Sequence, residues 1–234
     1  MTVGQDRIWE YYQNDRASSF DASSARLTFL VKALMKRVPK GARVLNIGVG
    51  GGQFEGAALQ HGLDVYSLDP SDRSITTLRE RLGLEQQAKV GYAEAIPFDS
   101  EFFEAVVMSE VLEHLTDAVL ERTMIEVRRV LKPSGVLMGT VPAGDDLAAN
   151  RVLCPCCGET FHRWGHEQSF TESSMRELLS RQLRVMTCER RYFVSWPHLN
   201  WKGRVGALAK LALLGAGVHG ADENLYFVAE KERG

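Results

Sequence analysis

Apolar and polar segments alternate along the chain from about residue 40 onward. Short apolar runs, such as residues 43–47, 63–68 and 103–108, are followed by stretches in which apolar residues recur with helical spacing. This alternation predicts parallel strands joined by helical crossovers, and therefore an open α/β sheet with helices on both faces. Four helices are expected, over residues 53–61, 71–82, 116–131 and 171–182. At least one end of each helix is marked by a capping residue, a glycine or a proline.

The first strand runs directly into a glycine-rich turn. Gly48, Gly50 and Gly52 stand at alternate positions, where the missing Cβ atoms let backbone N–H groups approach a ligand closely. Asp69 ends the next apolar run, and an acid at about this distance holds ribose hydroxyls in nucleotide-binding sheets. These features predict a nucleoside-containing cofactor. A dinucleotide is disfavoured, because its fingerprint requires a glycine where this chain has Gln53.

The pattern of Asn46 followed by three alternate glycines resembles motif I of the class I (Rossmann-like) S-adenosylmethionine-dependent methyltransferases. Five later segments resemble the same family in the family's order: residues 91–98, 103–109, 110–114, 127–135 and 224–231. The resemblance implies an open, mostly parallel seven-stranded sheet with S-adenosylmethionine (SAM) as cofactor. It also implies the cofactor-binding residues, which are Asn46, Gly48, Gly50, Gly52, Gln53, Asp69, Pro70, Ala93, Glu94, Ser109 and Glu110.

Two positions depart from the residues that are usual in this family. Asn46 replaces an acid, so a hydrogen bond takes the place of a salt bridge to the methionine amino group of the cofactor. Tyr92 replaces the acid that reads the adenine edge. The backbone N–H of Ala93 is then expected to contact the adenine, and Glu94 is a candidate replacement for the missing acid.

The expected domain organisation has a helical cap over residues 1–38 and a methyltransferase domain over residues 39–234. Two late insertions interrupt that domain: a cysteine and histidine loop at residues 144–166 and a helical lid at residues 194–222. In the cap, apolar residues with helical spacing predict packing on the body: Leu27, Leu30, Val31 and Leu34. Its aromatic residues are expected either to anchor a docking helix or to cover the cofactor: Trp9, Tyr11, Tyr12 and Phe20.

The cysteine and histidine loop has the spacing of a metal site. Cys154 and Cys157, followed by Gly158, form a knuckle-like C-P-x-C-G motif, and His162 and His166 lie four residues apart. Together they give C-x2-C-x4-H-x3-H, which predicts one structural, tetrahedral zinc ion. Three alternatives remain open: a reduced surface loop without metal, a ligand role for Cys156, and a His166 that faces the substrate.

A second group of candidate catalytic residues follows the fourth strand. Glu110 and His114 share one face of a helical turn, with Glu113 between them. These residues are expected either to orient the loop or to bind a divalent cation. His114 is also a candidate general base, assisted by Glu110, because an unperturbed imidazole suits removal of a proton from a hydroxyl.

Composition bounds the remaining possibilities. A net charge of −2 gives no global field that would favour nucleic acid or an anionic membrane. The longest apolar stretch, residues 205–218, contains Lys210 and is too short for a bilayer, and the N-terminus has no apolar leader, so no membrane association is expected. Four cysteines, three of them close together, favour reduced thiols or a metal over disulfides, and hence a cytoplasmic location.

The sequence therefore predicts a SAM-dependent methyltransferase that acts on a small or glycan-like molecule, on a hydroxyl oxygen. One alternative is an RNA or protein methyltransferase that uses the cysteine knuckle for recognition, which needs a basic face built from Arg128, Arg129, Lys132 and Arg151. Another is a protein that binds SAM or S-adenosylhomocysteine without catalysis. The expected partner is a small-molecule substrate, and the sequence indicates no oligomeric state.

Overall fold

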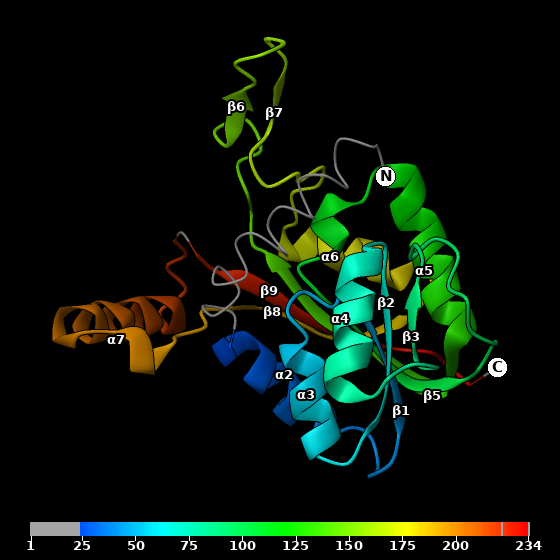
Figure 1. Ribbon diagram of the computed structural model, residues 1–234. Coiled ribbons are helices and arrows are strands. Elements are labelled where there is room, and N and C mark those ends of the chain that lie inside the picture. Colours follow the sequence, from blue (N-terminus) through cyan, green and yellow to red (C-terminus); the bar gives the residue numbers. More distant parts are fainter. Residues whose placement is uncertain (1–23, 221, 234) are drawn as a thin grey trace.

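The central strand, β1 (Arg43–Ile47), has a parallel partner on each side in a seven-stranded sheet. A computed structural model describes residues 24–220 and 222–233 (Figure 1). The strand order is β3-β2-β1-β4-β5-β9-β8, and only β9 runs antiparallel to its neighbours. The predicted open, mostly parallel sheet is confirmed. The other strands are β2 (Asp64–Asp69), β3 (Ala88–Val90), β4 (Phe103–Ser109), β5 (Leu131–Pro142), β8 (Arg184–Arg191) and β9 (Asn224–Glu230).

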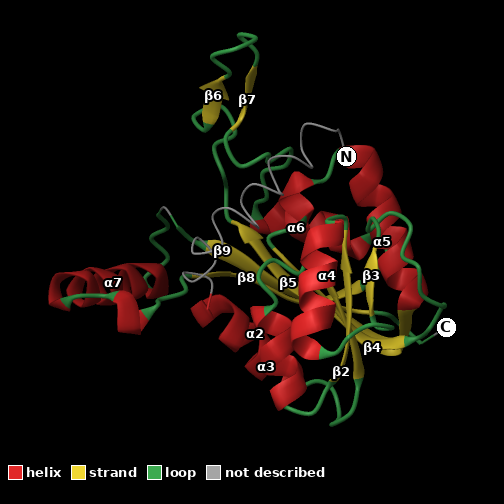
Figure 2. Ribbon diagram, in the orientation of Figure 1, coloured by secondary structure: helices red, strands yellow, loops and turns green. Residues whose placement is uncertain are grey.

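Helices cover both faces of the sheet, as Figure 2 shows. The alternation along β1 produces this arrangement: Val44 packs in a cluster with α2 (Ser24–Met35) and α3 (Gln53–Gln60), whereas Leu45 faces the opposite cluster. That opposite cluster includes α5 (Asp117–Val130) and α6 (Glu172–Ser180). A third cluster packs α4 (Asp72–Leu82) beside β3.

The predicted helix ends agree with the structure to within about two residues. The hydroxyl of Ser71 accepts the N–H of Ser74 at the start of α4, and Gly83 ends that helix with a φ of 68°. Thr171 caps α6 in the same way, through the N–H of Ser174. The helix ends are predictable from the sequence because a cap is a local interaction between residues three or four positions apart.

The N-terminal helix α2 packs on the body as its spacing predicts. Leu30, Val31 and Leu34 are buried, Leu27 is partly buried, and the ring of Phe29 meets Tyr226 of β9 edge-on. The aromatic residues predicted to dock or to cover the cofactor lie outside the described residues: Trp9, Tyr11, Tyr12 and Phe20.

Two late segments project from the body in different directions (Figure 1). One is the hairpin of β6 (Arg151–Leu153) and β7 (Thr160–His162). The other is α7 (Trp201–Gly215), in which Ala207 is the one buried side chain. The expected helical lid is therefore not formed by α7 itself. A short 3-10 helix, Trp196–His198, precedes α7, and another, Leu112–His114, follows β4.

Among the described helices, none combines the length and apolar character that a membrane span requires.

Substitutions at Gly139 in β5 and at Gly56 in α3 compare a closely packed position of the sheet with an open position on a helix. A Cβ on Gly139 would overlap the carbonyl oxygen of Met108 in the neighbouring strand, whereas a Cβ on Gly56 in α3 would meet nothing within 4 Å. We expect Gly139→Ala to lower the free energy of unfolding by about 2–3 kcal/mol. Gly56→Ala should raise it by about 0.5–1 kcal/mol, because alanine loses less backbone entropy in a helix. Urea unfolding of both variants measures this, and equal effects would contradict the packing.

Candidate functional site

A cleft of about 1030 Å³ opens at the carboxyl ends of β1, β2, β4 and β5. This is the edge of a parallel sheet at which ligands bind near the change of strand order. Nine of the predicted cofactor residues line the cleft: Asn46, Gly48, Gly50, Gln53, Asp69, Pro70, Ala93, Ser109 and Glu110. Gly52 and Glu94 are not among its lining residues in the described part of the chain. Gly52 instead precedes α3 with a φ of 74°, and a Cβ at this position would lie 2.8 Å from Leu78.

The glycine turn is fixed to the end of β2 by one carboxylate. Asp69 is 1% exposed, and its two oxygens accept the N–H groups of Val49 and Ser71, each at 2.9 Å. A carboxylate offers about four acceptor positions, so its oxygens can hold several N–H groups at once. The structure thus gives Asp69 a second task that the sequence pattern did not indicate, which is to hold the turn after β1 and the start of α4.

Asn46 takes part in a buried polar network beneath the glycine turn. Its amide donates to Glu55 Oε1 at 2.7 Å and to the carbonyl oxygen of Gly48 at 3.2 Å, and Ser67 Oγ donates to the same Glu55 oxygen at 3.1 Å. The structure therefore turns this amide toward the protein, whereas the sequence predicts that Asn46 contacts the cofactor. Glu55 was missed at the sequence level because it stands in the first turn of α3, where an acid is usually a solvent-exposed residue that favours the helix dipole.

Glu55 is fully buried, and burial raises the pKa of its carboxyl group from 4.5 to about 7. The hydrogen bond from Asn46 acts in the opposite direction, and the nearby Asp69 adds a smaller increase. Glu55 Oε2 has no hydrogen-bond partner among the described residues.

Gly91 and Ala93 line the cleft beyond β3, where the adenine is expected. Tyr92 is 41% exposed. Glu94 Oε2 is buried and has no hydrogen-bond partner among the described residues. The geometry therefore supports Ala93 as a backbone contact, whereas Glu94 is not among the residues that line the cleft.

Glu110 holds the loop after β4 in a left-handed conformation, with a φ of 58°. Its carboxylate accepts the Thr140 hydroxyl at 2.9 Å and the Asn224 amide at 3.1 Å, and it faces Arg26 at 3.7 Å. A non-glycine residue in this region of φ is strained, so these partners offset a conformational cost of about 1 kcal/mol. Glu110 is thus a positioning residue at the wall of the cleft.

Four ionisable side chains line the other end of the cleft, and a fifth, His162, lies close to two of them: the four are Glu113, His114, Asp145 and His166. Asp145 Oδ2 lies 2.5 Å from His166 Nδ1 and 3.4 Å from His162 Nε2. The rings of His162 and His166 stack with their centroids 4.5 Å apart, and the rings of His114 and His166 meet edge-on at 4.7 Å. The sequence singled out four of these residues, and Asp145 joins them from the end of β5.

Burial dominates the electrostatics of this group. It raises the pKa of Glu113 well above 4.5, with a further increase from the nearby Glu110. It lowers the pKa of His114 well below 6.5, with His166 adding to the effect. The pKa of His162 is also lowered, first by burial and then by His166.

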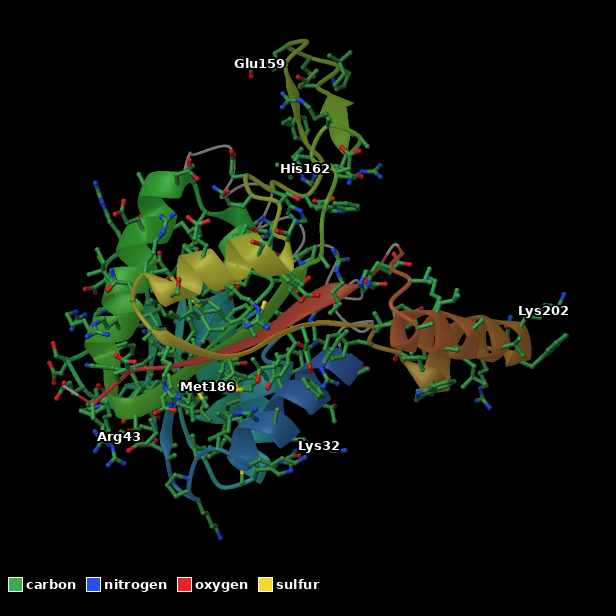
Figure 3. All side chains as sticks on the ribbon, turned by 180° about the vertical axis from the view of Figure 1, so that it is seen from behind. Lys32, Arg43, Glu159, His162, Met186 and Lys202 are labelled. Carbon is green, nitrogen blue, oxygen red and sulfur yellow. The ribbon has the colours of Figure 1, made fainter. Side chains whose placement is uncertain are left out.

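The structure does not assemble the predicted four-ligand zinc site. Cys154 lies at the far end of the hairpin, where its N–H donates to the carbonyl oxygen of Glu159, whereas His162 lies opposite Arg151 near the body (Figure 3). Cys154 is three positions further along the strand than Arg151, the residue that pairs with His162, which places it about 10 Å away. One zinc ion needs all its ligand atoms about 2.0–2.3 Å away. The hairpin register thus separates Cys154 and Cys157 from His162 and His166.

The cysteine pair does keep the local geometry of a knuckle. Backbone N–H groups of Cys157 and Cys156 lower the pKa of the Cys154 thiol, and Gly158 has a φ of 74°. All four cysteines are free thiols, and Cys188 is buried in the sheet.

Residues 45–139 match the family model of the methyltransferase domain. The chain carries a methyltransferase domain. The matched region begins in β1 and ends in β5, so it contains the glycine turn, Asp69 and the loop of Glu110.

Curated relatives match the methyltransferase domain over part of their length. The ubiquinone biosynthesis O-methyltransferase of Roseobacter denitrificans is 35% identical over 100 residues, which are 42% of this chain and 40% of that protein. The mitochondrial human ubiquinone biosynthesis O-methyltransferase is 29% identical over 147 residues, or 56% of this chain and 39% of the relative. The chain thus spans about two fifths of the length of these relatives.

Solved structures resemble the chain over nearly its whole length. One is a chain of the complex between the Haloferax volcanii Trm112 methyltransferase activator and a methyltransferase, with a TM-score of 0.70 at 17% identity over 97% of this chain and 98% of that one. Another is the Burkholderia thailandensis 1,6-didemethyltoxoflavin-N1-methyltransferase with bound S-adenosylhomocysteine, with a TM-score of 0.67 at 16% identity over 99% and 88%. These likenesses show that the methyltransferase domain has the class I methyltransferase fold.

The buried Glu55 makes stability depend on pH in a predictable direction. Because its pKa is raised in the folded state, the folded protein binds more protons than the unfolded chain between pH 4.5 and about 7, and stability falls as the pH rises through this range. Glu55→Gln imitates the protonated carboxyl and removes this dependence. Relative to the wild type, the variant should gain about 3 kcal/mol between pH 4 and pH 8, as measured by urea unfolding. Parallel pH curves for the two proteins would contradict the assignment.

Proposed function

We propose that the protein transfers the methyl group of SAM to a hydroxyl oxygen of a small molecule. The observation that supports this most directly is the shape of the cleft. One cavity of about 1030 Å³ runs from the glycine turn and Asp69 to the histidine and carboxylate cluster. That volume is at the upper end of the range for small-molecule sites, about 300–1,000 Å³, and offers room for a cofactor and an acceptor side by side.

The residues at the glycine end suit a nucleoside cofactor. Gly48 and Gly50 have φ values of 85° and 51° and carry no side chain, so the backbone of the turn lines the cleft directly. The carboxylate of Asp69 lines the cleft beside this turn. When bound, SAM supplies a methyl group activated by the positive charge of its sulfonium. The protein then has to align the acceptor, exclude water and accept the proton of a hydroxyl.

The charge of the cleft favours a neutral or cationic acceptor. Its described lining includes seven carboxylate side chains and two arginines, Arg26 and Arg190, and no lysine. A phosphate backbone needs the opposite balance, so the RNA alternative is disfavoured. The curated relatives named as O-methyltransferases support a hydroxyl as the acceptor group. His114 stands next to the acceptor end as the proposed base, 4% exposed, with Nδ1 donating to the carbonyl oxygen of Gly165 at 3.1 Å.

Asp69→Ala tests the cofactor assignment. The substitution removes charge-assisted hydrogen bonds to ribose hydroxyls and the anchor of the glycine turn, so SAM should bind about 1.5–3 kcal/mol more weakly in titration calorimetry. Asp64→Ala is the matched control, because this carboxylate stands at the start of the same strand and binds Gln87. Unchanged affinity in Asp69→Ala, or an equal loss in both variants, would reject the assignment.

Turnover with a panel of phenols, catechols and sugars tests the reaction itself. A SAM-dependent methyl ether product would establish O-methylation, whereas tight SAM binding with no product from any acceptor class would favour the non-catalytic alternative. His114→Ala should lower turnover by about 10²–10⁴-fold while SAM affinity remains unchanged, because this residue acts on the acceptor side. Near-normal turnover of that variant would show that alignment alone carries the reaction.

A further inference from the structure

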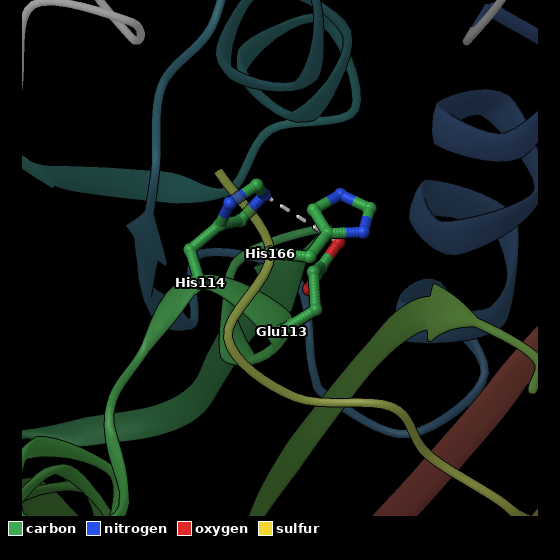
Figure 4. Close-up of side chains that lie close together, drawn as sticks. All are labelled: Glu113, His114 and His166. Atoms are coloured by element: carbon green, nitrogen blue, oxygen red, sulfur yellow. Dashed lines mark ion pairs between the residues drawn. The ribbon is translucent and has the colours of Figure 1, made fainter. Parts of the chain in front are cut away.

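Three side chains from two distant parts of the chain meet at the acceptor end of the cleft. Glu113 and His114 belong to the turn after β4, and His166 follows the hairpin (Figure 4). One potential ligand atom from each of these residues lies within 4.8 Å of the other two. Glu113 Oε1 and His114 Nε2 are 3.8 Å apart. Two donors that each lie about 2.1 Å from one metal ion are at most about 4.2 Å apart, so this spacing suits a shared ion.

The carboxylate of Glu113 is the second, independent observation. Its side chain is 2% exposed, and neither of its oxygens has a hydrogen-bond partner among the described residues. The other six carboxylates of the cleft each have a hydrogen-bond partner: Asp69 (Val49 N–H), Glu110 (Thr140 hydroxyl), Asp145 (His166), Asp146 (Ala148 N–H), Asp222 (Lys210) and Glu223 (Arg190). A buried carboxylate without a partner is costly, and a cation at this position would compensate it.

The hydrogen bonds of the two histidines match those of metal ligands. His114 Nδ1 donates to the carbonyl oxygen of Gly165 at 3.1 Å, and His166 Nδ1 donates to Asp145 Oδ2 at 2.5 Å. In each neutral ring the lone pair is then on Nε2. Metal-bound histidines almost always donate their other N–H to a carbonyl or carboxylate in this way, which fixes the tautomer and makes the ligand more basic.

We propose that Glu113, His114 and His166 bind one divalent transition-metal ion, with Asp145 as the outer hydrogen-bond partner of His166. Two imidazoles and one carboxylate favour zinc or a neighbouring first-row metal over magnesium, which prefers oxygen ligands. Glu110 is not a ligand, because Thr140, Asn224 and Arg26 already occupy its carboxylate. Cys154, Cys156 and Cys157 lie at the far end of the hairpin and do not contribute.

A metal ion here would sit where an acceptor hydroxyl is expected, and could lower the pKa of that hydroxyl as a Lewis acid. This role rests on the proposed methyl transfer and would replace the role of His114 as general base, because a metal-bound Nε2 has no lone pair left for a proton. The binding of the metal does not rest on the proposed methyl transfer. The experiment therefore measures metal and cofactor separately.

The 234-residue chain is treated with a chelator, dialysed and titrated with Zn²⁺ and with Co²⁺, whose visible absorption reports the ligand geometry. We expect one ion per chain, undisturbed by a large excess of Mg²⁺. Glu113→Gln keeps the shape of the side chain but removes its charge, and His166→Ala removes a ligand, so each should weaken Zn²⁺ binding at least 100-fold. Asp145→Asn should weaken it about 10–100-fold, the usual effect of losing an outer partner.

Cys157→Ser is the control at the far end of the hairpin, and its Zn²⁺ affinity should equal that of the wild type. Circular dichroism and SAM calorimetry on each variant show that the fold and the cofactor site persist. The proposal is overturned if the wild type binds neither Zn²⁺ nor Co²⁺ saturably, or if folded Glu113→Gln and His166→Ala retain wild-type affinity. It is also overturned if Cys157→Ser abolishes binding, since the metal would then belong to the knuckle. Failure of SAM to bind would reject the proposed function but would leave the conclusion on metal binding unchanged.

Discussion

The cleft depends on the carboxylate of Asp69, which holds the ends of two neighbouring parallel strands in one arrangement. Through Val49 and Ser71 it fixes the turn that leaves β1 and the turn that enters α4. Because β1 is buried between β2 and β4, its chain can only leave the sheet by a sharp turn, and Gly48 makes that turn with a φ of 85°. A side chain at Gly48 would also collide with Val111, so the loop after β4 can lie close only because the residue is glycine.

The fold was predictable from sequence because its signals are local. Apolar runs of the length of β1 and β4, glycine or capping residues beside the helices, and an acid at the end of β2 each act within a few residues of where they stand. The cofactor end of the site follows from the same signals, since parallel strands bring their carboxyl ends to one edge. Gly52 shows the limit: it is not among the described lining of the cleft, and a Cβ at this position would collide with Leu78 in α4.

The rest could not be predicted, because it depends on three-dimensional register. The spacing of the cysteines and histidines predicts one zinc site only if this loop is compact. Residues 151–153 and 160–162 instead pair as a hairpin that places Cys154 and His162 at opposite ends. Glu55 looks like an ordinary acid in the first turn of a helix, and only the packing of α3 on β1 shows that it is buried. For α7, the apolar composition predicts a covering element, yet Leu208 is 57% exposed and Leu213 is 50% exposed. Tertiary contacts between distant segments decide all three cases, and no short window of sequence contains them.

The balance of charge in the cleft connects its two ends. Carboxylates outnumber arginines seven to two along the described lining, and such a cavity attracts positive charge. SAM brings a positive sulfonium, and the charge disappears when the methyl group leaves. The attraction that helps to bind the substrate form of the cofactor is thus lost with the reaction, which favours exchange of the product. Fixed partners such as Arg26 and Arg190 compensate part of this charge, and burial raises the pKa of Glu113, which favours the neutral form of that carboxyl until a cation lies beside it. A group that carries positive charge during transfer is therefore best accommodated between the glycine turn and the histidine cluster, where the methyl group has to pass.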